Sequence, residues 1–519
     1  MNTESRTKNS VRNAILGLVF QIINIICSFI VRTVFIAYLS SSYLGISGLF
    51  TNILSLLSLA DLGFDTAIIY SLYKPIAEKN ENKVASLMNY FKKVYNIIGI
   101  IVLILGLLLL PFLDIIINLE NNIDNIKIYY VLYLLNTSCT YFLANRVAII
   151  NADQKMYIVK RIGFVFSIIQ SALQCLVLIL YRNFMLFLII QLICTIMKNI
   201  VGAFVAKKMY PFLRKNKSEL DKKERKEIIN NTKSFMIYKV GGVVLNNTDN
   251  ILISSLILTE VVGIYSNYTV IIDAFNTMIN LIFSASLASI GNLNVKGTHK
   301  QKENVLNRIK FMSIWIYGCC SICLLLLLND FIGIMWGKEY AMGFIIPLAA
   351  LINFLICGLL HPFRLYRETT AAFKEIKYIY IYTSILNLLL SVLFAWLMPS
   401  IELKLFGIII ATAIARLMTN YWFEPKKIYN IVFNKSSKKY FINNVVDILK
   451  IILIGFIVFL TIKGINVDSW IMMILKAIIC FVLTNILLFL FYKNTDEFKY
   501  FIDLGRKVLK NIKRKKQKV

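Results

Sequence analysis

The feature that most constrains this chain is a succession of apolar blocks, each about 20 residues long. A block of that length with few charges is what an α-helix needs to cross the hydrocarbon core of a bilayer. The 519 residues are 58% hydrophobic and only 16% charged, whereas soluble chains carry about 25% charged residues. We therefore expect an all-α membrane protein with about 14 transmembrane helices.

The expected spans follow from the limits of these blocks. The second and eighth are long and contain polar residues, and the ninth is short. Each end is placed to within a few residues. The spans are 13–39, 44–72, 94–113, 128–150, 162–181, 184–206, 234–258, 262–292, 311–328, 341–363, 379–398, 405–422, 444–462 and 470–492.

The basic residues give an independent indication of topology. The formal net charge of +29 would suit nucleic-acid binding only if these residues shared one folded face, and they lie instead in short bursts between apolar blocks. With the N-terminus inside, most of the 57 Lys and Arg residues fall in inner segments, as the positive-inside rule requires. The outer connections hold five: Lys127, Arg182, Lys338, Lys404 and Lys463. We predict a multi-pass protein of the cell (cytoplasmic) membrane with both termini cytoplasmic, membrane lipids as neighbours and no nucleic-acid partner.

An internal repeat divides the chain. Residues 35–50 (FIAYLSSSYLGISGLF) resemble residues 253–268 (ISSLILTEVVGIYSNY), and Gly45 and Gly263 are 218 residues apart. This separation superposes the first span on the seventh, so both halves enter the membrane in the same direction, as in parallel-repeat transporters. The predicted parts are an N-terminal six-helix lobe (1–206), a basic cytoplasmic linker (207–233), a C-terminal six-helix lobe (234–422), two additional transmembrane helices (423–492) and a basic cytoplasmic tail (493–519).

Polar and cationic residues inside the spans are the candidates for substrate binding. Ionisable groups in a membrane are costly and normally face a cavity or a partner, and Arg and Lys suit an anionic, phosphate-bearing substrate. Arg32 and Asn250 each lie thirteen residues before a glycine of the repeat. An alternative is that Arg32 pairs with Asp61 or Asp65 only to hold helices together. The candidates are Arg32, Arg146, Lys239, Asn250, Arg364 and Arg416.

Acidic residues inside the spans are candidates for ion or proton coupling. A buried carboxylate can bind Na⁺, or it can take up a proton because desolvation favours its neutral form. The chain has no G-x-x-x-x-G-K-[ST] loop, so we expect no nucleotide or other cofactor. We also expect no catalytic residues and no metal centre. The coupling candidates are Asp61, Asp65, Asp249 and Asp273.

Several passages resemble bacterial polysaccharide, O-antigen or capsule repeat-unit flippases of the multidrug/oligosaccharidyl-lipid/polysaccharide exporter superfamily. They are VRTVFIAYLSSSYLG (31–45), LADLGFDTAIIYSL (59–72), NADQKMYIVKR (151–161) and TDNILISSLILTEVVGIYSNY (248–268). The resemblance implies two pseudo-symmetric lobes that form a V-shaped central cavity and work by alternating access. It implies an undecaprenyl-diphosphate-linked oligosaccharide as substrate, and Arg32 matches the cavity arginine of the first span. Partners would include a polymerase and glycosyltransferases of the same pathway, and the additional helices would help to hold the lipid tail.

Two other classes stay open at this point. A multidrug exporter of the same superfamily would favour an acidic, aromatic cavity and usually has twelve spans. A membrane polymerase would have a large outer loop, and an acyltransferase would need a histidine base. The chain has two histidines, His299 and His361, neither of which has a visible acid or nucleophile partner in the sequence, so we expect a transporter and not an enzyme.

Overall fold

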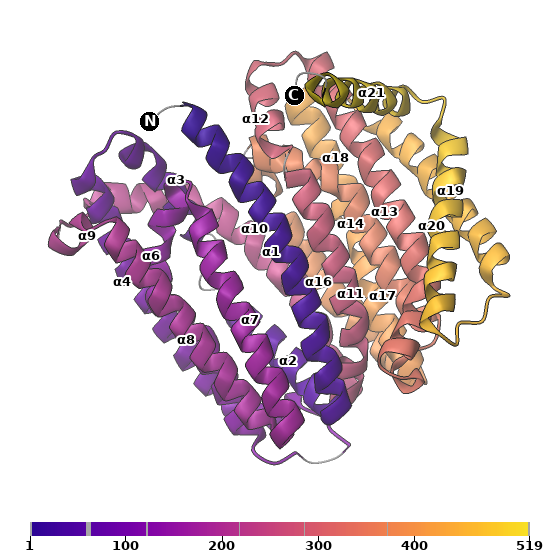
Figure 1. Cartoon of the computed structure of the whole chain (residues 1–519), viewed down its shortest axis with the longest axis horizontal. Helices are drawn as coiled ribbons and strands as arrows, with labels where there is room; N and C mark the ends of the chain where they lie inside the picture. Colours follow the sequence, from indigo (N-terminus) through magenta and orange to yellow (C-terminus); the bar gives the residue numbers. More distant parts are fainter. Residues whose placement is uncertain are drawn as a thin grey trace. The chain divides into compact units, whose positions relative to one another are not determined.

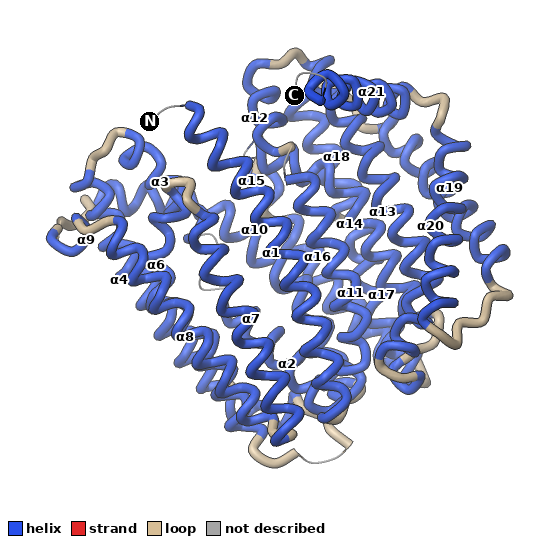
Figure 2. The backbone as a smooth tube through the Cα atoms, viewed as in Figure 1, coloured by secondary structure: helices blue, strands red, loops and turns tan. Residues whose placement is uncertain are grey.

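The computed structural model describes residues 3–58, 64–120, 123–216, 218–284, 286–370 and 372–516. Within these ranges the chain consists of helices and loops and contains no strand (Figure 2). The expected all-α fold is confirmed.

The helices follow one another along the chain as shown in Figure 1. In unbroken order they are α1 (Thr3–Tyr38), α2 (Ser41–Leu57), α3 (Phe64–Ala77), α4 (Glu81–Leu108), η2 (Leu110–Phe112), α5 (Leu113–Ile116), α6 (Ile126–Ala152), α7 (Met156–Tyr181), α8 (Phe184–Met209), α9 (Phe212–Lys215), α10 (Lys222–Leu256), α11 (Thr259–Ser284), α12 (Leu287–Lys296), α13 (His299–Met335), η3 (Lys338–Tyr340), α14 (Ile345–Thr370), α15 (Phe373–Ile376), α16 (Ile379–Leu397), α17 (Ile401–Met418), α18 (Asn420–Ile428), η4 (Tyr429–Phe433), α19 (Lys438–Ile462), α20 (Trp470–Tyr492) and α21 (Asp496–Lys516).

Most of the expected spans coincide with a single helix. The expected span 44–72 falls on two helices, α2 and α3, and residues 59–63 between them lie outside the described ranges. The expected span 262–292 likewise falls on α11 and α12, which flank residue 285, also outside those ranges. The ninth span, 311–328, is shorter than α13, because this helix continues into polar sequence at its start. Hydropathy marks where a helix meets lipid, whereas capping residues mark where it begins.

Side-chain caps set the start of several helices. Thr298 and Gln301 form a reciprocal capping box at α13, which satisfies two of the backbone donors that a helix N-terminus leaves unpaired. Asn80, Asn183 and Ser469 accept a backbone N–H at the starts of α4, α8 and α20.

Nine helices of the described ranges are long and apolar enough to cross a membrane by length and composition. Three that do not meet this criterion are α2, α6 and α10. Helix α2 is apolar but has only 17 residues, and polar side chains of all three helices line a cavity described below. Helices that enclose a polar space in a membrane protein carry weaker hydropathy than helices that face only lipid and protein.

The chain divides into two compact units. The first comprises Met1–Asn267 and Lys377–Ile408, and the second comprises Tyr268–Ile376 and Ile409–Val519. The lobe boundaries expected from the repeat stay a prediction.

In the first unit, α1 packs beside α7, and α6 packs against both α4 and α8 (Figure 1). Helix α16 approaches α10 so closely that a Cβ on Gly241 would lie 2.5 Å from the carbonyl carbon of Tyr380. The Ser384 hydroxyl donates to the Gly241 carbonyl at 2.6 Å. The glycine therefore permits two helix backbones to meet and a side chain to bridge them.

The expected basic linker is tied to the polar start of α4 in the same unit. Glu219 bonds Lys93 at 2.6 Å and Arg225 at 3.3 Å. The Lys93 ammonium, and Arg225 to a smaller extent, lower the pKa of the Glu219 carboxyl. All three side chains are largely open to solvent or partly so, so each pair contributes little to stability.

In the second unit, α13 packs against α14, α19 and α20. Lys476 of α20 is 8% exposed, and its ammonium lies 2.7 Å from the carboxylate of Asp330 on α13. Nearer the start of α13, the indole N–H of Trp315 donates a hydrogen bond to the amide oxygen of Asn485 on α20 at 3.0 Å. These two polar contacts attach the additional helix α20 to α13 in surroundings where unpaired polar groups are costly.

Candidate functional site

The two copies of the repeat contact each other directly, within the first unit. A Cβ built on Gly45 of α2 would overlap the backbone carbonyl of Thr259 at the start of α11. A Cβ built on Gly263 of α11 would overlap the backbone carbonyl of Ser41 at the start of α2. Both pairs are related by the 218-residue offset of the repeat, so the contact is self-complementary, as in an interface around a two-fold axis. Only glycine at these two positions allows the helices to approach so closely.

Arg32 reaches the same turn from α1. Its Nε donates to the Asn267 amide oxygen at 2.7 Å, and its Nη2 donates to the Ser266 hydroxyl and, at 3.5 Å, to the Gly263 carbonyl. The guanidinium therefore joins α1 to the first turns of α11. Its role in substrate binding stays a prediction, and the structure adds this bridging role to it.

The loop that follows α5 closes the same region. Asn118 donates to the Ile257 carbonyl at 2.7 Å, and its own carbonyl accepts from the Thr259 backbone N–H at 2.7 Å. Ser42 donates to the Glu260 carboxylate at 3.1 Å. The turn between α10 and α11 is thus held on two sides.

A cavity of about 460 Å³ lies within the first unit, between α2, α6, α8 and α10. Eight of its ten lining side chains carry a hydroxyl or an amide, and none is charged. The lining residues are Thr51, Leu54, Ser55, Ser58, Tyr133, Asn136, Thr137, Gln191, Val243 and Asn247. Its size falls in the range of about 300–1,000 Å³ that is usual for small-molecule sites.

None of the residues predicted from the sequence lines this cavity, but two of them neighbour it on α10. Lys239 lies about one helical turn before Val243, and Asn250 lies about one turn after Asn247. All four positions share one face of the helix. The Lys239 ammonium lies 4.9 Å from the centre of the Phe235 ring.

Asp249 lies against α16 in the same unit. Its carboxylate accepts a hydrogen bond from the Asn387 amide at 3.2 Å, and the Ser391 hydroxyl donates to the Asn387 amide oxygen at 3.3 Å. Asn387 and Ser391 are buried. Asp249 itself is half-buried, so its carboxylate has a polar partner at the edge of a buried cluster.

The second unit contains two of the predicted arginines. Arg364 and the His361 ring both contact the Asn280 amide oxygen, with His361 Nε2 at 3.1 Å. Arg416 lies 2.7 Å from the Cys357 sulfur. Both of these contacts are with neutral groups, an amide oxygen for Arg364 and a thiol sulfur for Arg416.

The remaining candidates are dispersed or not described. Arg146 is exposed on α6, and Asp273 is exposed on α11. Asp61 lies outside the described residues, and Asp65 lies at the start of α3, where the structure describes the backbone alone.

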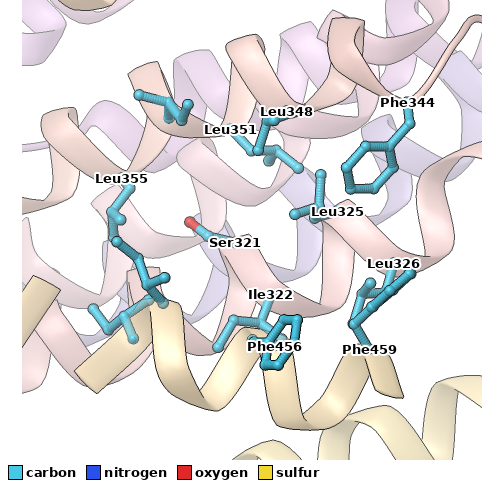
Figure 3. A pocket seen from close by; sticks show the side chains of 14 residues that line it. Ser321, Ile322, Leu325, Leu326, Phe344, Leu348, Leu351, Leu355, Phe456 and Phe459 are labelled. Carbon is cyan, nitrogen blue, oxygen red and sulfur yellow. The ribbon is translucent and has the colours of Figure 1, made fainter. Parts of the chain in front are cut away.

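An apolar groove of about 400 Å³ lies in the second unit between α13, α14 and α19. Figure 3 shows Leu325, Phe344 and Phe456 converging on it. Ser321 is the one polar side chain among the fourteen that line it. The additional helix α19 supplies one wall, with Ile451, Ile452, Gly455, Phe456 and Phe459.

Sequence reasoning missed the neutral residues of the polar cavity. Charged groups in a span attract attention because they are costly, whereas single Ser, Thr or Asn residues are common in helices and bond to their own backbone. A signal was present in span 128–150, where Tyr133, Asn136, Thr137 and Thr140 recur at helical spacing.

The comparisons with known proteins agree with this fold. Residues 10–288 match the family model described as "Polysaccharide biosynthesis protein". This match covers more than half of the 519 residues, and the chain belongs to the polysaccharide biosynthesis protein family. No curated protein sequence matches the chain significantly.

Among solved structures, the chain is similar to the lipid II flippase MurJ in an inward closed conformation, with a TM-score of 0.65 and 14% identity over 92% of this chain and 99% of that one. An inward-facing MATE family multidrug resistance transporter of the MOP superfamily gives a TM-score of 0.58 and 10% identity over 80% of this chain and 98% of that one. A mutant of the Vibrio cholerae MATE transporter VcmN gives a TM-score of 0.53 and 14% identity, over 83% of this chain and 99% of that one. The chain shares the fold of these membrane transporters, and the expected membership of the polysaccharide family is confirmed by the family model.

Proposed function

We propose that this protein is a flippase that moves an undecaprenyl-diphosphate-linked oligosaccharide repeat unit from the inner to the outer leaflet of the cytoplasmic membrane for the assembly of surface polysaccharide. The observation that carries the proposal is that a member of the polysaccharide biosynthesis protein family contains two kinds of internal space. One is lined by hydroxyls and amides, and the other by aliphatic and aromatic side chains. A lipid-linked sugar needs both, whereas a soluble metabolite needs only the first.

The proposed mechanism is alternating access by movement of two lobes about the substrate, as in other repeat-built transporters. Arginine suits the diphosphate because its planar donors bind phosphate oxygens in pairs. Arg32 is the arginine that we assign to the head group, and Arg364 and Arg416 of the second unit stay candidates for it. The apolar groove beside α19 suits the polyprenyl tail.

The first test is deletion of this protein in its own cell, followed by analysis of lipid-linked saccharides. We expect a lipid-linked oligosaccharide to accumulate on the cytoplasmic leaflet and surface polysaccharide to disappear. Unchanged polysaccharide together with new sensitivity to cationic drugs would replace the proposal with multidrug export.

The same assay tests Arg32. If the guanidinium binds phosphate, Arg32→Lys should retain part of the transport rate because the positive charge remains, and Arg32→Gln should lose it. If Arg32 only bridges α1 to Ser266 and Asn267, Arg32→Gln should retain more activity, since a neutral amide still donates hydrogen bonds. Normal transport by Arg32→Ala would contradict both roles.

We assign coupling to Asp249, whose carboxylate suits Na⁺ binding or protonation. Asp249→Asn keeps the shape and removes the charge, so it should make transport insensitive to collapse of the Na⁺ or H⁺ gradient that drives the wild-type protein. The measurement is translocation into proteoliposomes with each gradient imposed separately. An Asp249→Asn chain that still follows one gradient would exclude this carboxylate.

A further inference from the structure

From the polar cavity of the first unit, we infer that it binds an uncharged, hydroxyl-rich sugar and disfavours an acidic one. This inference rests on the proposed flippase function and specifies which part of the substrate one site takes. Its basis is the chemistry of the cavity wall and the direction of the hydrogen bonds already made there.

The wall of the cavity is formed mainly by neutral polar side chains that lie along helices and not in loops. Four different helices contribute to it, including Thr51 from α2, Asn136 from α6, Gln191 from α8 and Asn247 from α10. Polar groups away from water are costly unless they have partners. Such a cluster is therefore expected where water or a polar ligand fills the space.

The hydroxyl groups of α2 and of its C-terminal cap already donate their protons to backbone carbonyls. Thr51, Ser55 and Ser58 donate to the carbonyls of Ser47, Thr51 and Leu54 at 2.7, 2.8 and 2.8 Å. A hydroxyl has one proton to donate and two lone pairs that accept. These three side chains can therefore offer acceptor oxygens to a ligand.

The side chains of α6 and α10 add to this bias. Thr137 donates to the Tyr133 carbonyl at 3.1 Å, and the Asn247 amide donates one proton to the Val243 carbonyl at 2.8 Å. The amide oxygen of Asn136 is buried and has no hydrogen-bond partner among the described residues. An unpartnered buried acceptor that lines a cavity indicates that a donor from a ligand or water occupies the space beside it.

A wall with more acceptors than donors discriminates between sugars. Each hydroxyl of a neutral sugar can donate a proton to the wall, whereas a carboxylate has no proton to donate and brings a negative charge. No cation is among the described residues that line the cavity, and Lys239 lies about one helical turn beyond its wall. A charge without a partner inside such a site is strongly disfavoured. By the same argument we place the diphosphate of the substrate at Arg32 and outside this cavity.

The test measures binding of three lipid probes to the full chain in nanodiscs by native mass spectrometry. The probes are undecaprenyl diphosphate, the same lipid bearing glucose, and the same lipid bearing glucuronic acid, which differs from glucose by one oxidised carbon. We expect the glucose probe to bind at least tenfold more tightly than the glucuronic acid probe. Equal binding of the two would overturn the inference.

Variants locate the effect. Asn136→Leu should weaken binding of the glucose probe about tenfold, the value of one hydrogen bond to a buried acceptor, and should leave binding of undecaprenyl diphosphate unchanged. Gln191→Leu, on another helix, should do the same and keeps the test valid if Asn136→Leu does not fold. Gln170→Leu on α7 is the matched control, because Gln170 contacts Gln174 and does not line the cavity.

The two proposals fail in different ways. If no lipid probe binds the wild-type chain, both the flippase function and the sugar site are wrong. If the probes bind but the cavity variants behave like Gln170→Leu, only the sugar site is wrong, and the cavity is a hydrated space between helices.

Discussion

Replacement of Gly45 by alanine should strongly reduce transport and leave a folded protein in the membrane. The added methyl group would overlap the backbone carbonyl of Thr259, and a backbone atom cannot rotate aside as a flexible side chain can. Overpacking of this kind costs about 1–3 kcal/mol, which corresponds to roughly 5–150-fold in an equilibrium between two conformations. The conformation in which α2 and α11 touch should be depopulated by that factor.

The measurement combines transport with cross-linking of the contact. Ser42 and Glu260 are hydrogen-bonded across it at 3.1 Å, so a Ser42→Cys/Glu260→Cys pair in a background without other reactive cysteines should oxidise readily. Gly45→Ala should lower the yield of that cross-link. Unchanged cross-linking with unchanged transport would show that this contact does not limit the transport cycle.

Because the repeat is symmetric, the same contact can be tested from its other side. Gly263→Ala should have a similar effect, because its methyl group would overlap the Ser41 carbonyl. The double variant should cost less than the sum of the two single variants, since both act on one interface. Gly163→Ala on α7 is the matched control: its added methyl group would meet no atom within 4 Å, and we expect it to transport normally.

The repeat illustrates how much of the fold could be predicted from the sequence. The 218-residue offset is visible as similar letters around Gly45 and Gly263, and each glycine follows a short connection between two expected spans. The sequence did not indicate that the two copies touch, because similarity between segments carries no information on the distance between them. The close approach becomes visible only when the missing Cβ atoms are built on both backbones.

Span positions were largely predictable, since the free energy of placing a helix in lipid depends mainly on its own residues. The exceptions have local causes. The start of α13 was missed because Thr298 and Gln301 cap a helix whose first turns are polar, and hydropathy does not detect polar turns.

The candidate site was less predictable than the fold. Arg32 and Arg364 stood out as charges in apolar surroundings, but their neutral partners, such as Asn267 and Asn280, come from distant helices. Asn136 and Gln191 did not stand out at all, because their importance depends on facing the same space. Chemical type is readable from sequence, whereas convergence of side chains from several helices is a property of the packed structure.

The largest effect on stability is expected at Arg367 of α14 and Glu424 of α18, which form an ion pair inside the second unit. Both side chains are completely buried. Glu424→Leu or Arg367→Met alone leaves an ionised group without its charged partner in a low-dielectric interior, which costs about 3–5 kcal/mol. We expect either single variant to reach the membrane in much smaller amounts and to unfold at a much lower temperature in detergent.

The double variant Arg367→Met/Glu424→Leu decides whether the pair itself is needed. Replacement of a buried ion pair by apolar side chains of similar volume is often neutral or stabilising, so we expect the double variant to recover most of the lost stability and transport. The control is Glu78→Gln: the Lys74–Glu78 pair is 3.9 Å long and well exposed, and its loss should cost less than about 1 kcal/mol. Recovery of stability without transport would indicate that these charges also act in the transport cycle, because apolar residues can replace the packing of the pair but not its charge.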